Sequence, residues 1–285
     1  MKLIPMVTGL KTTQKNSNLT TNYKKELSIQ VNLNGLSFCV FNRSENSIEH
    51  LSLFHFEKKE NPSVLLQNIQ KHLASNTAFS DSFDQVTLLY QNDLATLVPL
   101  ELFNPANAAD YLKFNSKILK LDVIEFDEIR SNKSVIIYVP LMNINNYIFE
   151  TFGEFTFKHT AAVLIETLLN QENDANPKVY INMNFAHFEM LVLKNQGLEF
   201  YNYFEFSSPE DFIYYVLFTF EQLGLNPEDI PVYFTGEISD ESECYKMAFT
   251  YIRHLHFLNP NYKFRFDSNI ESTQAHRHFT ILNSF

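Results

Sequence analysis

The chain has 285 residues, of which 45% are hydrophobic, so it can bury one large core or two of ordinary size. Its 33 acidic and 22 basic residues give a net charge of -11, which repels phosphate backbones and anionic membranes at long range. We therefore expect no nucleic-acid partner and no membrane insertion. Only six glycines occur, where an average chain of this length carries about 20, so glycine-rich ligand loops are excluded.

The first 25 residues join a short apolar run, MKLIPMVTGL, to a polar tract without a small-residue cleavage site. We interpret residues 1–25 as a mobile N-terminal lead and not as a signal peptide. The most apolar run, residues 212–220, is nine residues long, less than half of a membrane span. Cys39 and Cys244 lack a CxxC motif or a histidine at ligand spacing, which favours a reducing cytoplasm.

From Glu26 onward the pattern predicts three strands, a helix and a fourth strand. Turns are expected at Gly35 and at the polar residues 43–47. The helix begins at Asn61 and Pro62, an N-cap followed by a proline at the first helical position. The predicted strands are residues 27–33, 37–41, 48–56 and 86–90.

The middle of the chain contains an insertion around residues 91–130. It is predicted to hold a helix over residues 99–112 and a strand over residues 118–126. A strand at 135–139, a helix at 143–152, a strand at 154–157 and a helix at 160–169 should follow. Residues 171–177, which contain no large apolar side chain, are the predicted linker between two domains.

The second half repeats the order of the first, with strands predicted at 179–183, 185–193 and 198–206, a helix at 208–223 and a strand at 230–235. Asn-x-Asn occurs five times in the chain, so that spacing alone carries no weight. The shared order together with six identities at an offset of 150 residues indicates a duplicated unit. The identities are Asn32/Asn182, Asn34/Asn184, Phe38/Phe188, Glu49/Glu199, Phe54/Phe204 and Phe56/Phe206.

This duplicated order, joined by a helix, resembles the actin-like ATPase fold of actin, sugar kinases, heat-shock chaperones and the actin-like proteins of type IV pilus assembly. The resemblance covers residues 26–266, and residues 153–168 are similar to the strand and linking helix of the pilus-assembly branch. The chain also resembles an uncharacterised bacterial family of this fold. The resemblance implies an α/β fold of two ribonuclease H-like lobes, residues 26–170 and 178–285, each with a mixed five-stranded sheet.

In that fold a hairpin from each lobe holds the nucleotide phosphates, an Asp organises the water shell of Mg²⁺, and a glycine pair contacts the adenosine. The resemblance places the hairpins at residues 32–37 and 182–187 and the glycine motif at residues 232–238. The implied nucleotide-binding residues are Asn32, Asn34, Gly35, Asn182, Asn184 and Gly236.

Both hairpins depart from the family pattern. Asn32 and Asn182 stand where a carboxylate is expected, and a neutral amide adds no charge toward Mg²⁺. The second hairpin has no glycine, and Phe185 puts a large ring beside its turn. We therefore expect a decayed nucleotide site with no catalytic residue and no cofactor beyond weak ATP binding. The expected role is binding or scaffolding with a protein partner or as a homodimer.

Two alternatives remain open. The first is a working ATPase or small-molecule kinase in which Asp93 or Glu237 replaces the missing acid. The second is a homodimer formed through Tyr201 and Tyr203, because strand alternation sends these tyrosines to one face of residues 198–206 and the phenylalanines to the other. A change in elution volume on replacing both tyrosines would support the dimer.

No metal site is predicted. If residues 242–258 form a helix, His254 and His256 diverge by about 200° and cannot share an ion. His276 and His278 could share a strand face, but no further ligand stands beside them at the right spacing. No GxSxG, GxGxxG or GxxxxGK[ST] motif occurs, and the acids of residues 125–128 are interpreted as a solvated loop.

Overall fold

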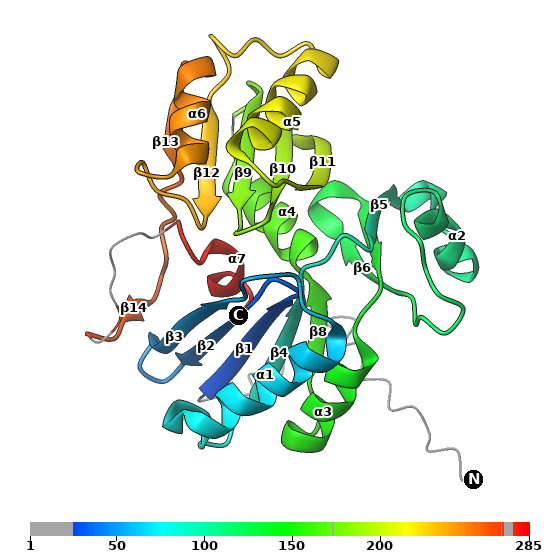
Figure 1. The fold of residues 1–285 in the computed structure, drawn as a ribbon, viewed down its shortest axis with the longest axis vertical. Helices are drawn as coiled ribbons and strands as arrows, with labels where there is room; N and C mark the ends of the chain where they lie inside the picture. Colours follow the sequence, from blue (N-terminus) through cyan, green and yellow to red (C-terminus); the bar gives the residue numbers. More distant parts are fainter. Residues whose placement is uncertain (1–24, 173, 269, 271–275) are drawn as a thin grey trace.

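The computed structural model describes residues 25–172, 174–268, 270 and 276–285, and the predicted lead at residues 1–24 lies outside them. The described chain forms two lobes, one above the other, and a smaller sheet projects to one side of them (Figure 1). None of the helices in the described ranges is long and apolar enough to cross a membrane.

The first lobe is built on a six-stranded mixed sheet in the order β14-β3-β2-β1-β4-β8. The first three strands form the predicted antiparallel meander, β4 pairs in parallel with β1, and β8 pairs in parallel with β4. The strands are β1 (Lys25–Asn32), β2 (Gly35–Asn42), β3 (Ser47–His55), β4 (Gln85–Tyr90), β8 (Thr156–His159) and β14 (Arg265–Phe266).

The second lobe repeats the arrangement in a five-stranded sheet of order β11-β10-β9-β12-β13. Its meander is again antiparallel, and β12 and β13 again follow in parallel. Each of its strands has a counterpart at the same place in the first sheet, so the predicted repeat is present in the topology. The strands are β9 (Lys178–Met183), β10 (His187–Lys194), β11 (Gly197–Glu205), β12 (Val232–Gly236) and β13 (Leu255–Phe257).

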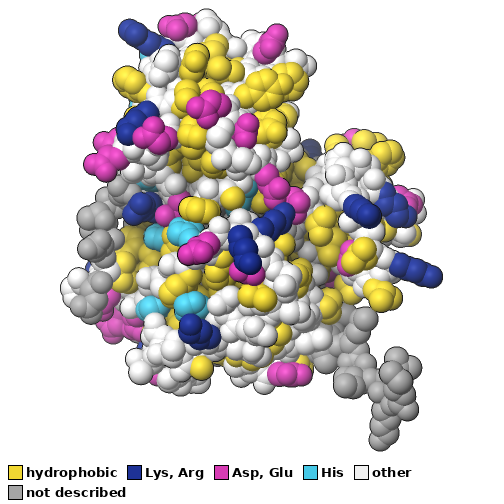
Figure 2. All heavy atoms as spheres, viewed as in Figure 1, with side chains coloured by type: hydrophobic (Ala, Val, Ile, Leu, Met, Phe, Trp, Pro, Cys, Tyr) yellow, Lys and Arg dark blue, Asp and Glu magenta, His cyan; other side chains and the backbone are white. Residues whose placement is uncertain are grey.

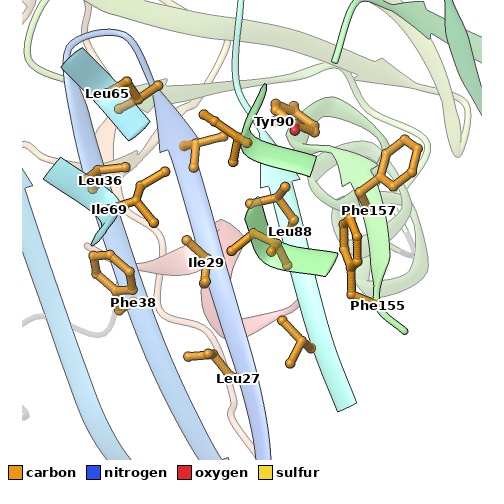
Figure 3. Packing of buried hydrophobic residues seen from close by; sticks show 14 of the residues in the cluster. Leu27, Ile29, Leu36, Phe38, Leu65, Ile69, Leu88, Tyr90, Phe155 and Phe157 are labelled. Carbon is orange, nitrogen blue, oxygen red and sulfur yellow. The ribbon is translucent and has the colours of Figure 1, made fainter. Parts of the chain in front are cut away.

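Helices α1 (Pro62–Ser75) and α3 (Met142–Phe152) cover one face of the first sheet (Figure 1). Leu65 and Ile69 of α1 belong to one buried cluster with Ile29 of β1 and Phe38 of β2 (Figure 3). Burying side chains of this size stabilises the fold by about 1.5–3 kcal/mol each. The predicted N-cap of α1 is confirmed, because Asn61 Oδ1 accepts hydrogen bonds from the amides of residues 63 and 64.

Helices α5 (Pro209–Gln222) and α6 (Glu243–Tyr251) cover the corresponding face of the second sheet (Figure 1). Phe212 and Phe220 of α5 share a buried cluster with Phe188 of β10 and Phe234 of β12. The helix over residues 242–258 that was considered for His254 and His256 does not form at that length, since α6 ends at Tyr251. The following residues pair as β13 with β12, so sheet pairing overrides local helix preference there.

Two further helices lie where the lobes meet. α4 (Thr160–Gln171) is apolar on almost every side, as expected of a fully surrounded helix, and it packs on the other face of the second sheet. α7 (Phe279–Leu282), near the end of the chain, packs against Cys39 and Phe41 of the first sheet. The lobes are therefore joined by shared cores.

The insertion forms a three-stranded antiparallel sheet of β5 (Ala95–Pro99), β7 (Ser134–Tyr138) and β6 (Glu125–Ile129), with α2 (Ala108–Lys113) packed against it. The predicted helix over residues 99–112 is wrong in its first half, where Pro99 ends β5 and two 3-10 turns, Leu100–Leu102 and Pro105–Asn107, follow. Pro99 and Pro105 cannot donate the amide hydrogen bonds of a continuous helix.

The strand predicted at 118–126 begins only at Glu125, and the acids of residues 125–128 lie on this strand instead of in a loop. Two more 3-10 turns are Thr77–Phe79 and Arg130–Asn132.

The C-terminal part differs from the predicted boundary that gave all of residues 178–285 to the second lobe. β14 pairs in parallel with β3, which gives the first sheet one strand more than predicted. Ile281 and Leu282 of α7 are buried against the first sheet as well. Ser284 Oγ lies 2.7 Å from Ser28 Oγ of β1, which ties the end of the chain to the first lobe.

Candidate functional site

The six predicted binding residues line two small cavities where the lobes meet. Asn32, Asn34 and Gly35 of the first hairpin line one cavity, and Asn182 and Gly236 of the second lobe line the other. Asn184 lines both, as do Gln30, Ser37 and Leu53. Each cavity has a volume of about 20 Å³, which is room for about one water molecule. Duplicated hairpins thus meet at one place, although little open space lies between them.

The first hairpin uses its polar groups internally. Asn32 Nδ2 donates to the carbonyl of Gln91 at 2.7 Å, and Asn32 Oδ1 accepts from the amide of Asn34 at 2.7 Å. The two carbonyls of the turn, at residues 33 and 34, accept from the amides of Glu60 and Phe56. A Cβ added at Gly35 would lie 2.6 Å from the carbonyl oxygen of residue 54, so this glycine is required by the close approach of β3.

The second hairpin is longer than the first. Met183 faces Phe188, and the amide of Asn184 donates to the carbonyl of His187 at 2.9 Å, so the chain turns at residues 185 and 186, whereas the first hairpin turns at residues 33 and 34, directly after Asn32. The strand predicted from Phe185 therefore begins at residue 187. Phe185 is 57% exposed, and its ring lies 5.5 Å from that of His55 across the lobe boundary.

A buried carboxylate, Glu189 of β10, connects the lobes. It is 0% exposed and accepts three hydrogen bonds, from Gln91 Nε2 at 2.9 Å, Asn182 Nδ2 at 2.8 Å and the Tyr201 hydroxyl at 2.9 Å. Gln91 belongs to the first lobe and accepts in turn from Gln30 Nε2 at 3.1 Å. Burial raises the pKa of Glu189, and the three donors partly offset this effect.

Sequence reasoning missed this network. Glu189 lies inside the strand predicted at residues 185–193 and Gln91 at the start of the predicted insertion, and neither is among the predicted site residues. A single charge inside an otherwise apolar strand was the available signal, because a buried charge requires hydrogen-bond partners. Its partners come from three other segments, which the sequence does not place beside it.

His187 at the start of β10 is 2% exposed, and its ring stacks on Tyr203 at 4.5 Å. Neither ring nitrogen has a hydrogen-bond partner among the described residues, and the same holds for Asn184 Nδ2. Burial, with a smaller contribution from the charge of Lys59, lowers the pKa of His187 to about 3. The imidazole is therefore neutral at physiological pH.

Two charged side chains, Glu237 and Arg277, line the second cavity. Glu237 lines the second cavity, and its Oε2 lies 4.0 Å from both Arg277 Nε and His55 Nε2. Burial raises the pKa of Glu237, and the charge of Arg277 opposes this shift. Asp93, the other acid considered as a catalytic replacement, is 45% exposed and pairs with Lys59 at 3.7 Å.

The histidine pairs occupy other places than predicted. His256 lies on β13, and His254 precedes that strand instead of sharing a helix with it. His276 and His278 lie in the turn before α7 and not on a strand, and His276 Nε2 lies 2.9 Å from the carbonyl oxygen of Ile238. Over the described ranges no three His, Cys, Asp or Glu side chains gather as a metal site would require.

The homodimer face predicted on β11 is wrong. Phe200 and Phe204 join the core of the second lobe as expected, but Tyr201 and Tyr203 face inward too. Tyr201 packs in the cluster around α4 and donates to Glu189, and Tyr203 stacks on His187. The second face of β11 is covered by the linking helix and the other lobe, so it does not form a free surface.

Two lobes with one strand order, a linking helix between them and a hairpin from each at the shared boundary define an actin-like ATPase fold. A Bacteroides thetaiotaomicron protein of that fold and of unknown function has a TM-score of 0.74 and 22% identity, covering 86% of this chain and 94% of its own. The PilM-PilN type IV pilus biogenesis complex has a TM-score of 0.60 and 13% identity, covering 90% and 96%. The ethanolamine utilization protein EutJ from Carboxydothermus hydrogenoformans has a TM-score of 0.50 and 8% identity, covering 91% and 88%.

The chain belongs to the DUF3822 family, described as a protein of unknown function, whose model matches residues 14–255. The comparison with curated proteins found no match. The predicted fold is thus confirmed, together with the resemblance to pilus-assembly proteins and to an uncharacterised family. At these identities the solved structures establish the fold alone.

Proposed function

We propose that this protein is a non-catalytic binding or scaffolding protein of actin-like fold whose nucleotide site has decayed. The observation that carries the proposal is the Glu189 network, in which side chains of the two lobes bond to each other where the fold would hold a ligand. The cavities left beside it measure about 20 Å³, whereas small-molecule sites span roughly 300–1,000 Å³.

The electrostatics of the boundary support the same role. Glu189 is buried without an ion-pair partner in the described part of the chain, and Glu237 lies at the second cavity. An ATP triphosphate seated there would face two carboxyl groups in a region of low dielectric. Asn32 and Asn182 supply amides that are already hydrogen-bonded, so neither replaces the carboxylate that organises Mg²⁺.

A protein partner is the second part of the proposal. The similar PilM-PilN structure is a complex of two proteins, which supports a binding role by analogy of fold. Cys39 and Cys244 are both free thiols, which fits the reducing cytoplasm in which we place the protein.

A second candidate, an ATPase or small-molecule kinase, is favoured by one observation. Glu237 follows Gly236 directly and lines the second cavity beside Arg277, so a carboxyl group and a guanidinium cation stand at the boundary between the lobes. Opening of the lobes would be required before a nucleotide could reach them.

Thermal denaturation with 5 mM Mg-ATP separates the two functions. If the dissociation constant is 5 mM or weaker, the stabilisation is at most about 0.4 kcal/mol, which corresponds to a rise in Tm of about 1 °C. Arg277→Ala should leave that small shift unchanged, as should its control Arg265→Ala on β14. A rise of many degrees that requires Arg277, together with Mg²⁺-dependent phosphate release, would overturn the non-catalytic role in favour of the enzyme.

A further inference from the structure

Three exposed aromatic side chains lie on the helices that cover the second sheet. Tyr214 and Phe218 of α5 are 62% and 46% exposed, and Phe249 of α6 is 69% exposed. The inner sides of the helices already supply the core, so none of these three rings is needed there. If each ring offers about 200 Å², the exposed aromatic area is on the order of 350 Å², a size at which apolar patches often bind partners.

The aromatic side chains are arranged in helical rows. Tyr214 and Phe218 are four residues apart, and their rings stack at a centroid distance of 6.0 Å. Phe249 stacks in the same way on Tyr245, one turn earlier in α6, at 6.4 Å. α5 and α6 pack against each other, so both rows belong to the helical side of the second lobe.

Acidic side chains flank the aromatic row of α5. Along α5 the pair Tyr214 and Phe218 is bracketed by Glu210 and Asp211 at one end and Glu221 at the other, all exposed. Figure 2 shows hydrophobic side chains over this lobe with acidic ones interspersed. Between residues 207 and 254, eight acidic side chains and two basic ones, Lys246 and Arg253, are exposed. The eight acids are Glu210, Asp211, Glu221, Glu228, Asp229, Asp240, Glu241 and Glu243.

The charge selects among the occupants that an apolar face could have. A second copy of the chain docked through the same face would place like charges opposite each other. An anionic membrane surface would be repelled for the same reason. A partner segment with apolar residues at its centre and lysine or arginine at both ends would be complementary to α5, where the aromatic pair lies between acidic side chains.

We propose that the outer face of α5 and α6 is a docking site for a basic amphipathic helix of a partner protein. Its apolar side chains would pack on the two aromatic rows, and its basic side chains would lie beside the acids at the ends of α5. This inference deepens the proposed binding role, on which it rests, by naming the kind of partner.

The insertion provides a matched comparison. Phe114 and Leu121 are 87% and 85% exposed, so the insertion also presents apolar side chains to solvent. Exposed Lys113, Lys117 and Lys120 stand beside them in the sequence, and Asp110 pairs with Lys113 at 2.7 Å, so this surface lacks the acidic excess found along α5. A peptide that is selected by charge should therefore bind the face of α5 and α6 and not the insertion, although both surfaces expose apolar side chains.

A synthetic 18-residue helical peptide of Leu, Ala and Lys with one Trp tests the proposal. The protein contains no Trp, so excitation of the peptide Trp reports binding without background. The protein should bind this peptide and not the same peptide with Glu in place of Lys. Phe218→Ala/Phe249→Ala should weaken binding at least tenfold, whereas Phe114→Ala/Leu121→Ala should change it less than twofold.

Charge is tested separately by Glu210→Gln/Glu221→Gln, which should weaken peptide binding severalfold at low salt. The difference in affinity between this variant and the wild type should narrow in 0.5 M salt.

All four substituted aromatic and apolar positions are exposed, and matching far-UV circular dichroism spectra would show that each variant is folded. The proposal is overturned if the wild type does not bind the Lys peptide, binds the Glu peptide equally well, or loses nothing in the Phe218/Phe249 variant. A wild-type dimer that this variant dissociates would assign the face to a second copy instead. Mg-ATP stabilisation of the same samples reports on the nucleotide site, so failure of the docking site and failure of the non-catalytic role remain distinguishable.

Discussion

A buried carboxyl and a buried imidazole face the same boundary between the lobes and respond to pH in opposite directions. Burial raises the pKa of Glu189, so the folded state holds its proton at a higher pH than the unfolded state does, and falling pH favours folding in that window. Burial lowers the pKa of His187 to about 3. The unfolded imidazole protonates near pH 6.5, so its contribution to stability is lost as the pH falls from there toward 3.

Replacing His187 with Phe should make the protein less sensitive to acid. Phe keeps a ring against Tyr203, and it removes two nitrogens that have no partner among the described residues. Between pH 7 and pH 5 the wild type should lose about 2 kcal/mol more unfolding free energy than the variant. Urea denaturation at both pH values measures this difference.

His254→Phe is the control, because His254 is exposed just before β13 and should leave the pH dependence unchanged. Equal acid sensitivity of wild type and His187→Phe would show that the imidazole is not held neutral by burial.

Residue identity predicted part of the boundary between the lobes. The repeated strand order brings Asn32, Asn34, Asn182 and Asn184 to the cavities between the lobes, because it fixes where the hairpins meet. Their part in nucleotide binding stays a prediction. Residue identity did not predict that the amide of Asn182 bonds to Glu189 and not to a ligand. That partner depends on side-chain contacts between β9 and β10, which residue spacing does not specify.

At the scale of elements, the end of β12 presses on β9. Gly236 has φ of 82°, in the region that favours glycine, and a Cβ there would lie 2.1 Å from the carbonyl oxygen of Met183. The opposing atom belongs to the backbone of β9, so a side-chain movement cannot relieve the clash. Gly236 is therefore required by strand packing, whatever its part in ligand binding.

Gly236→Ala should destabilise the protein by more than about 3 kcal/mol, because it combines a strained φ with a backbone clash. Gly224 also has a positive φ, of 64°, but a Cβ there would meet no atom within 4 Å. Gly224→Ala should cost only about 1–2 kcal/mol. Thermal denaturation of the two variants gives the comparison, and equal losses of stability would contradict the clash.

Elements with local signals were predicted well. α1 and α5 begin where Asn61 and Ser208 cap a helix with proline next in sequence. Elements that depend on distant partners were predicted poorly. β13 lies in a segment that was considered as a helix, and it forms a strand because it pairs with β12. β14 has only two residues, and nothing local marks it as the neighbour of β3.

At the scale of the whole molecule, the lobes exchange helices across their boundary. α4 follows the last strand of the first lobe but packs mainly on the second sheet, with Val163 in the cluster of the first. α7 follows the second lobe and packs on the first sheet through Ile281 and Leu282, while Phe279 lies in the cluster of α4 and the second sheet. The sequence repeat predicted two lobes but not this exchange. Both helices are apolar on several sides, so their sequences do not show which sheet each one packs against. Two lobes with shared cores should unfold together.

Phe279→Ala tests this coupling, since Phe279 of α7 is 1% exposed and lies in the cluster formed by α4 and the second sheet. The substitution should cost about 3–5 kcal/mol. Because the chain has no Trp, single reporters can be introduced at Phe149→Trp in the first lobe and Phe249→Trp in the second, which are 38% and 69% exposed. Both reporters should show one urea transition, and Phe279→Ala should move the midpoints of both to the same lower urea concentration.

Phe114→Ala, at an 87% exposed position, is the control and should move neither midpoint. Two separate transitions, with only the second-lobe reporter responding to Phe279→Ala, would mean that each lobe folds on its own and that the exchanged helices do not couple them.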